Sequence, residues 1–471
     1  MKPGKRKTQI GLMLKQFKKS RCIALSLLLG TLALTLYNFS FFRSMVSRQF
    51  WPEIGKVVVS DQIHQILVNL SRTIHRSSDD LFNPPGDVSF QRLNTHDLWL
   101  FSAFYDTISN KKLVRIFGLQ DTALNDPVVC YLIEANETYR IYGTRQLLVD
   151  NHGYRLRVVS FECEIDPTSK PNFVSLTFSS DNTLPTNSLE VFYSLPLQRN
   201  FTVCYAVLFD FTNYRQIIQN VEFNRVLGAE HFFAYNMSIS STTDAVLRHY
   251  QKRGLMTVIQ WPLPASEIHY NGQVLAINDC VYRNKGISKY VVIQDTDEFI
   301  IPNHHDNWVD LIHEINQEYD LKNNCSTSHE QIGTYIVEST FFQEMPTRKE
   351  FSEIKKHYFI SDRDEKMFQR YSLTVFTNLV RMNQTFGDAR QKSIVRPEMV
   401  LFPDVHTTIA HRPSATDVRV HESLALVHHQ RFHSAAGSIL DTSSLRFKDA
   451  VIPLVRRTLY SLSKQGLKFK N

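Results

Sequence analysis

The sequence has almost no charge imbalance once its first 21 residues are set aside. The 471 residues carry a net charge of +7, and the first 21 contain eight lysines and arginines and no acidic residue. The remaining 450 residues therefore have a net charge of −1. Proteins that bind nucleic acid concentrate basic residues on the surface that contacts phosphates. The near-neutral body of this chain excludes a nucleic-acid partner.

Two further features are scarce or missing. Six histidines fall between His406 and His433, but no His-Glu-x-x-His sequence marks the helix of a zinc hydrolase. Only six cysteines occur in the whole chain, and five of them follow residue 42. An oxidising compartment permits disulfides among those five, but the sequence does not give their pairing.

A long uncharged segment follows the basic tail of residues 1–21. It runs from Cys22 to Phe42, and 21 residues are enough to span a bilayer as a helix. A cleaved signal peptide is the main alternative, but small residues should then follow the apolar core. The bulky Phe39 and Phe41 stand there instead. We therefore expect one transmembrane signal anchor, with the basic tail in the cytosol and the rest in the secretory lumen.

The luminal part divides into four regions by composition. Residues 43–89 are polar and close with the turn sequence NPPGD, which is typical of a stem. The alternative for residues 63–74 is an N-terminal helix packed on the domain. Residues 90–195 contain short β-rich runs and predict an accessory region, and residues 436–471 predict a C-terminal helical tail. Six Asn-x-Ser/Thr acceptors are consistent with a luminal location: Asn69, Asn136, Asn200, Asn236, Asn324 and Asn383.

The region 196–435 alternates between strand and helix patterns. Apolar runs FTVCYAVLFDF, HFFAYNMS, LMTVIQWP and YVVIQDTDEFIIP are separated by three segments with helical spacing. This alternation predicts an α/β domain with a mostly parallel sheet and right-handed crossovers. Ligands of such sheets bind beyond the carboxyl ends of the strands.

Three carboxylates interrupt the fourth strand near that end. They are Asp295, Asp297 and Glu298, in the sequence DTDE. On an extended strand the first two share a face, where they repel each other unless a cation intervenes. A hard divalent cation, Mn²⁺ or Mg²⁺, bound also to a diphosphate supplies that charge. A solvated turn is the alternative, because Asp-x-Asp recurs by chance.

A second enzyme class also uses Asp-x-Asp at a strand end. In phosphohydrolases of the haloacid dehalogenase type the first Asp is the nucleophile and lies on the first strand. Here the motif lies on the fourth strand, and Asp297 is followed by Glu298 and Phe299 rather than by the Thr or Val of that class. The pattern does not favour this hydrolase class.

Several blocks of the sequence resemble glycosyltransferase family 92. The blocks are GAEHFFAYNMSIS, VLRHYQKRG, VIQWP, GQVLAINDCVYRN and YVVIQDTDEFIIP, with outlying FSAFYDTISNKKLVRIFG, KSIVRPEMV and LVHHQRFH. The resemblance extends over residues 95–433. It implies a GT-A fold, a UDP-sugar donor (UDP-galactose), inversion at the anomeric carbon, and a glycan acceptor on a glycoprotein or glycolipid. We expect a type II membrane protein of the Golgi.

The resemblance also implies roles for individual residues. Asp297 is expected to bind the metal directly, Asp295 to contact the donor or the metal, and His406 to complete the coordination. Lys392 and Arg396 are expected to pair with the diphosphate. The alternatives are a structural histidine at 406 and solvated charges at 392 and 396.

The general base is not identified by any motif. Inversion requires a group that deprotonates the acceptor hydroxyl, and the candidates are Glu298, Glu338, Glu344 and Asp388. Residues 429–431 read HQR where relatives often have HYR, which removes an aromatic face for the acceptor. A catalytically inactive glycan-binding or scaffold protein of the same fold remains the alternative function.

Overall fold

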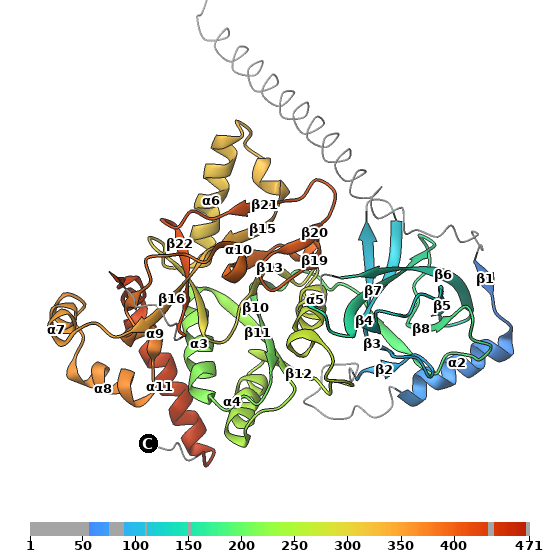
Figure 1. The fold of residues 1–471 in the computed structure, drawn as a ribbon, viewed down its shortest axis with the longest axis horizontal. Coiled ribbons are helices and arrows are strands. Elements are labelled where there is room, and N and C mark those ends of the chain that lie inside the picture. Colours follow the sequence, from blue (N-terminus) through green and yellow to red (C-terminus); the bar gives the residue numbers. More distant parts are fainter. Residues whose placement is uncertain (1–55, 75–88, 109–110, 149–151, 432–437, 468–471) are drawn as a thin grey trace, which may run out of the picture.

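The computed structural model describes residues 56–74, 89–108, 111–148, 152–431 and 438–467. They form a β-barrel followed by a larger α/β domain (Figure 1). The predicted basic tail and the predicted anchor at residues 22–42 lie outside the described residues. Within the described ranges, no helix is both long enough and apolar enough to cross a membrane.

The barrel closes because the two strands at the ends of its sheet, β6 and β7, pair with each other. Seven strands follow the order β6-β5-β8-β9-β3-β4-β7, and β7 also pairs with β6. Closure removes free sheet edges. A disulfide between Cys130 and Cys163 joins β5 to β7 inside the barrel core. The strands are β1 (Val57–Val58), β2 (Gln91–Arg92), β3 (Leu98–Ile108), β4 (Lys111–Asp121), β5 (Val128–Ile133), β6 (Thr138–Leu147), β7 (Leu156–Ile165), β8 (Phe173–Phe178) and β9 (Leu189–Phe192).

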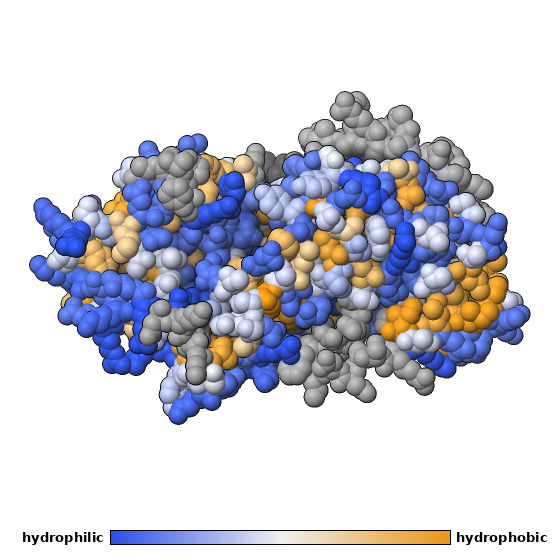
Figure 2. Space-filling view, turned by 60° about the horizontal axis from the view of Figure 1, so that its bottom comes forward, coloured by the Kyte–Doolittle hydropathy of each residue, from blue (hydrophilic) through white to orange (hydrophobic). Residues whose placement is uncertain are grey.

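Part of the predicted stem belongs to the barrel. Helix α2 (Asp61–Ile74) buries Leu67 against Tyr131 and Ile133 of β5. The packed-helix alternative therefore describes residues 61–74 better than an extended stem. Figure 2 shows a hydrophobic area at the barrel end of the molecule, the end where Val58 of β1 and Ile66 of α2 are exposed.

The α/β domain is built on a twisted sheet whose first four strands are parallel. Their order is β12-β11-β10-β13, and antiparallel β18 extends the sheet to β15 and β21. The predicted alternation of strands and helices is confirmed. The elements are β10 (Arg199–Leu208), α3 (Tyr214–Leu227), β11 (Ala229–Asn236), α4 (Ser241–Lys252), β12 (Met256–Gln260), η1 (His269–Gly272), α5 (Gln273–Arg283) and β13 (Ser288–Ile293).

The fourth predicted strand is not continuous. It ends at Ile293, residues 294–297 form a turn, and β14 (Glu298–Pro302) enters a different sheet. The Glu298 N–H closes the turn by donating to the Asp295 carbonyl at 3.2 Å. The prediction that Asp295 and Asp297 share one face of a strand is therefore wrong. The second sheet contains β14, β22 (Ala425–His429), β16 (Ser339–Glu344), β17 (Val380–Arg381) and β23 (Ile439–Leu440).

The C-terminal helix is part of this domain's core. Helix α11 (Lys448–Lys464) buries Val451, Val455 and Leu459 in the same apolar cluster as Phe223 of α3. Residues 436–471 are therefore not simply a tail added to the domain.

The remaining elements of the α/β domain are α6 (Trp308–Lys322), η2 (Ser328–Gln331), β15 (Ile332–Val337), α7 (Arg348–His357), α8 (Asp362–Arg370), α9 (Thr374–Thr377), α10 (Gly387–Arg390), β18 (Lys392–Val395), η3 (Pro397–Met399), β19 (Val400–Pro403), β20 (Thr408–His411), β21 (Thr416–Arg419) and η4 (Ser443–Phe447).

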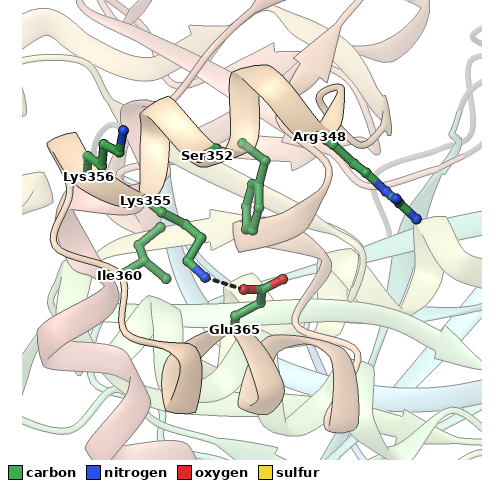
Figure 3. A pocket seen from close by; sticks show the side chains of 7 residues that line it. Arg348, Ser352, Lys355, Lys356, Ile360 and Glu365 are labelled. Atoms are coloured by element: carbon green, nitrogen blue, oxygen red, sulfur yellow. Dashed lines mark hydrogen bonds and ion pairs between the residues drawn. The ribbon is translucent and has the colours of Figure 1, made fainter.

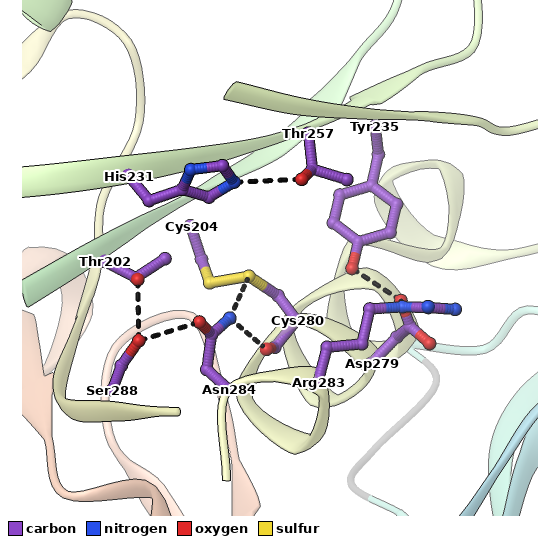
Figure 4. The surroundings of a disulfide bond; sticks show 10 residues. All are labelled: Thr202, Cys204, His231, Tyr235, Thr257, Asp279, Cys280, Arg283, Asn284 and Ser288. Carbon is purple, nitrogen blue, oxygen red and sulfur yellow. Dashed lines mark hydrogen bonds and ion pairs between the residues drawn. A yellow bond between two sulfur atoms is a disulfide. The ribbon is translucent and has the colours of Figure 1, made fainter. Parts of the chain in front are cut away.

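A second disulfide fixes helix α5 to the parallel sheet. It joins Cys204 of β10 to Cys280 (Figure 4). The Asn284 side chain donates to the Cys280 carbonyl at 2.8 Å and accepts from the Ser288 hydroxyl at 2.9 Å. Because α5 also packs on barrel strands β3 and β4, this disulfide helps to fix the barrel relative to the sheet.

One buried carboxylate joins the barrel to the α/β domain. Asp106 of β3 lies 3.2 Å from the Arg115 guanidinium and 3.4 Å from the Lys285 ammonium, and it also pairs with Arg412. The Tyr282 hydroxyl donates to it at 3.2 Å. Burial raises the pKa of Asp106, but Lys285, Arg115 and Arg412 outweigh burial and hold that pKa well below its usual range.

Candidate active site

The acidic turn lies at the carboxyl end of β13 and surrounds a buried lysine. The Lys392 ammonium, at the start of β18, donates to Asp295 Oδ2 at 2.9 Å and lies 3.0 Å from Glu298 Oε2. The Lys392 side chain is 1% exposed, whereas that of Asp295 is 40% exposed. The turn therefore has an inner side filled by a cation and an outer side open to solvent.

Burial and charge act in opposite directions on the three groups. Burial lowers the pKa of Lys392, but the two carboxyl groups outweigh burial and raise that pKa above its usual value. Burial likewise raises the pKa of Asp295, and Lys392 outweighs burial and lowers it. For Glu298, burial prevails and raises the pKa. Asp295 is thus the carboxylate that the lysine keeps ionised.

Histidine 429 contacts the other side of the turn. Its Nε2 lies 3.5 Å from Asp297 Oδ2 and its Nδ1 lies 3.4 Å from Glu298 Oε1. The contact follows from strand pairing, because Glu298 of β14 is the register partner of His429 in β22. The neighbouring His428 points to the opposite face, as alternation in a strand requires, and stacks on Phe342 with ring centroids 3.8 Å apart.

Histidine 406 lies beside this cluster with one ring nitrogen engaged. It occupies the turn between β19 and β20, and its Nδ1 pairs with the Gln391 carbonyl at 3.0 Å. A carbonyl only accepts, so Nδ1 carries the proton and Nε2 carries the lone pair in the neutral ring. Burial and then the Lys392 charge lower the pKa of His406, which favours this neutral form.

The two residues predicted to pair with the diphosphate, Lys392 and Arg396, each contact groups of the protein itself. The Lys392 ammonium is enclosed by carboxyl groups of the protein. Arg396 lies past the other end of β18, where its guanidinium donates to the backbone carbonyls of Glu330 at 2.8 Å and Ile332 at 3.2 Å. The pairing of Val395 with Val291, two residues before the end of β13, places Arg396 away from the acidic turn. Arg396 therefore binds backbone carbonyls in this structure, and its pairing with the diphosphate stays a prediction.

The candidate bases differ in their access to the site. Glu298 is buried, and its oxygens face Lys392, His429 and the Asp295 N–H. Glu338 is half-buried in the link between β15 and β16, directly after Val337, which pairs with Lys392. Asp388 belongs to α10, which ends just before Gln391. Glu344 is exposed at the far end of β16. Glu338 and α10 therefore lie on segments next to the backbone of Lys392, whereas Glu344 lies at the far end of its strand.

The predicted metal set is only partly assembled. In the described part of the chain, no three His, Cys, Asp or Glu side chains are grouped closely enough to hold a metal ion. Asp295 is bound to Lys392, whereas Asp297 is 26% exposed and His406 has an imidazole nitrogen with a lone pair. One carboxylate oxygen and one imidazole suit Mn²⁺ or Mg²⁺ when a diphosphate supplies the remaining oxygens. The residues present fit a cation shared with a substrate, not a closed protein cage.

A separate hollow of about 490 Å³ lies between α7 and α8. Figure 3 shows Lys355 pointing across the hollow to Glu365, while Arg348 and Lys356 extend away from that pair. Lys355 lies 2.5 Å from Glu365 and 2.9 Å from Asp362. The central cation of this hollow is therefore already neutralised by two carboxylates.

Comparison with known proteins decides the family. The family model described as glycosyltransferase family 92 matches residues 199–459, more than half of the chain and all of the acidic cluster. The chain belongs to glycosyltransferase family 92. The match includes most of α11, in agreement with the packing of that helix on α3.

Two relatives from Caenorhabditis elegans show how far the similarity extends. One, named beta-1,4-galactosyltransferase galt-1, is 24% identical over 49% of this chain and 57% of its own length. The other, named glycosyltransferase family 92 protein F13G3.3, is 22% identical over 45% of each chain. The chain thus spans about half the length of these relatives.

Among solved structures, Mycobacterium tuberculosis glucosyl-3-phosphoglycerate synthase with phosphoglyceric acid matches 58% of this chain and 82% of its own. The identity is 12% and the TM-score is 0.24, a likeness too low to bear on function.

Sequence reasoning missed His429 as a member of the site in this family 92 chain. His429 lies in the block LVHHQRFH, which resembles the family. Its contact with the acidic turn, however, depends on the pairing of β14 with β22. The Gln430 N–H adds to this link by donating to the Asp297 carbonyl at 2.8 Å. Only the pairing of segments about 130 residues apart brings His429 to the acidic turn.

Proposed function

We propose that this chain transfers a hexose, galactose, from a UDP-sugar to a glycan acceptor with inversion at the anomeric carbon. Membership of the family supports glycosyl transfer, and the name of one relative motivates the choice of galactose. The observation that carries the proposal is the acidic turn at the carboxyl end of the parallel sheet, where open α/β sheets bind ligands. A GT-A arrangement of the domain is part of the same proposal.

In this proposal the donor diphosphate binds on the open side of the turn. Asp297 and His406 are the proposed protein ligands of Mn²⁺ or Mg²⁺, and such a cation supplies positive charge where the departing UDP becomes more negative. Asp295, oriented by Lys392, is proposed to contact the donor ribose directly or through water. The cluster thus combines Asp297, a partly exposed carboxylate beside His429, with Asp295, a carboxylate restrained by Lys392.

The acceptor hydroxyl must lose a proton as the new glycosidic bond forms. We propose Glu338 as the base, with Asp388 as the second candidate, because both lie on segments that adjoin Lys392. We do not propose Glu298 as the base, because its carboxyl group is enclosed by Lys392 and His429.

The location of the protein is also proposed. The uncharged segment at residues 22–42 and the basic residues before it favour a single-pass type II protein of the Golgi membrane, with both described domains in the lumen. Digestion of cell-expressed protein with an N-glycosidase should lower its apparent mass. A full-length chain with no N-glycan on any acceptor would count against a luminal body.

The deciding experiment offers the purified full chain a panel of UDP-sugars with glycoprotein glycans as acceptors. We expect transfer from UDP-galactose, loss of transfer in excess EDTA, and recovery when Mn²⁺ is added. Full activity in EDTA would remove the metal from the proposal. Binding of UDP without transfer or hydrolysis of any donor would favour an inactive glycan-binding protein.

A further inference from the structure

The acidic turn surrounds a buried lysine of β18, Lys392, whose position suits a different task from donor binding. Its ammonium group contacts Asp295 at 2.9 Å and Glu298 at 3.0 Å, and its side chain is 1% exposed. A ligand on the open side of the turn meets carboxylates before it meets this cation. Any effect of Lys392 on a bound donor therefore passes through Asp295 and Glu298.

The contacts of Lys392 close a small ring around the turn. Glu298 Oε2, which faces the lysine, also accepts from the Asp295 N–H at 2.8 Å. The Asp295 carbonyl in turn accepts from the Glu298 N–H at 3.2 Å. These bonds tie both ends of the turn to one ammonium, so the backbone that carries Asp297 has little freedom.

The same segment also ties the turn to its surroundings. Lys392 pairs in register with Val337 of β15. The preceding Gln391 accepts from His406 through its carbonyl at 3.0 Å and from Arg419 through its side chain at 3.0 Å. The dipeptide Gln391–Lys392 thus links the acidic turn, the His406 turn and β15.

We infer that Lys392 is a positioning residue for the donor site. It holds Asp295 and Glu298 together so that the turn presents Asp297 as the carboxylate available to the donor complex. The inference rests on the proposed function for the identity of the donor, but the restraint of the turn is a property of the protein without ligand. Removing the cation leaves the buried Glu298 carboxyl group and the neighbouring, partly exposed Asp295 carboxylate without their shared counter-charge, which drives the two groups apart.

Two readouts test this role in the full chain. Lys392→Met should raise the KM for the UDP-sugar at least about tenfold, with a smaller change in the KM for the acceptor. Without any ligand, it should also speed hydrogen–deuterium exchange in the peptide that covers residues 290–302. Lys392→Arg should recover most of both properties. The matched control is Lys355→Met, which removes a lysine held by two carboxylates outside the site and should change neither readout.

The double variant Lys392→Met with Glu298→Gln separates positioning from direct binding. Positioning predicts partial recovery of donor KM and of exchange protection, because one of the two repelling carboxyl groups has been removed. A lysine that itself bound the diphosphate would give no recovery, and that result would overturn the inference. If the single variant does not fold, Lys392→Arg and the double variant supply the same comparison.

The exchange readout also distinguishes failure of this inference from failure of the proposed function. A wild-type chain that transfers no sugar, yet loses protection at residues 290–302 in Lys392→Met, retains the positioning role without the transferase. Unchanged exchange in Lys392→Met contradicts the positioning role whatever the activity.

Discussion

Two clusters of charged side chains differ in their balance of acidic and basic groups. One lies at the junction of the two domains, and the other lies at the acidic turn. At the junction one carboxylate, Asp106, faces Arg115, Lys285 and Arg412. At the turn one ammonium, Lys392, faces Asp295 and Glu298, with Asp297 beyond them. The Asp106 side chain is 2% exposed, whereas that of Asp297 is 26% exposed.

This difference separates a structural cluster from a binding cluster. Buried charges are tolerated when charged partners surround them. Removing one of these partners leaves an uncompensated buried charge and lowers stability. A cluster that is short of positive charge and open on one side is suited to receive a cation with its ligand. The junction is closed and the turn is open, so substitutions should affect stability at the first and transfer at the second.

The largest expected effect on stability comes from the junction. Asp106→Asn keeps the size of the side chain but leaves three cations without their shared carboxylate. We expect the free energy of unfolding to fall by about 3–5 kcal/mol, measured by denaturant unfolding. The control is Asp362→Asn, an 88% exposed partner of Lys355, which should leave stability unchanged. Equal stability of Asp106→Asn and the wild type would remove the distinction between the two clusters.

A smaller effect concerns pH at the same junction. Burial lowers the pKa of Lys285 to about 7. The unfolded chain keeps that proton up to about pH 10.4, so between these values the unfolded state binds more protons and rising pH favours the folded state. Stability should therefore gain up to about 1.4 kcal/mol per pH unit above pH 7. Lys285→Met should flatten this pH dependence, measured by thermal unfolding from pH 7 to 9. If the variant keeps the wild-type pH dependence, groups other than Lys285 cause it.

The smallest effect is expected for Arg396. Its guanidinium donates to the carbonyls of Glu330 and Ile332, away from the acidic turn. Arg396→Lys should leave the KM for the UDP-sugar within about twofold of the wild type, because no donor contact is lost. Steady-state kinetics against donor concentration measure this. A large rise in KM would return Arg396 to the donor site.

Local patterns in the sequence were sufficient for much of the α/β domain. The alternation of strands and helices from β10 to β13 depends on apolar runs and helix ends that lie close together in the chain. The acidic cluster was placed correctly at the carboxyl end of β13 for the same reason. The break after Ile293 was missed because an apolar run continues on both sides of it, and only pairing of β14 with β22 shows the change of sheet.

Long-range pairing accounts for the other differences. His429 reaches Asp297 through β22, and Lys392 reaches Asp295 through β18. Neither the register of these strands nor the enclosure of Lys392 can be derived from spacing along the chain. Closure of the barrel likewise depends on a strand pairing, that of β6 with β7, which spacing along the chain does not reveal.

The most direct test of the account is Asp297→Asn. This change keeps the shape of the side chain and removes the charge assigned to the donor complex. Transfer from the UDP-sugar should fall at least about a hundredfold, while the melting temperature stays that of the wild type. The matched control is Asp306→Asn, 87% exposed just beyond the motif, which should retain transfer. Near wild-type turnover in Asp297→Asn would contradict the central claim that the acidic turn is the donor site.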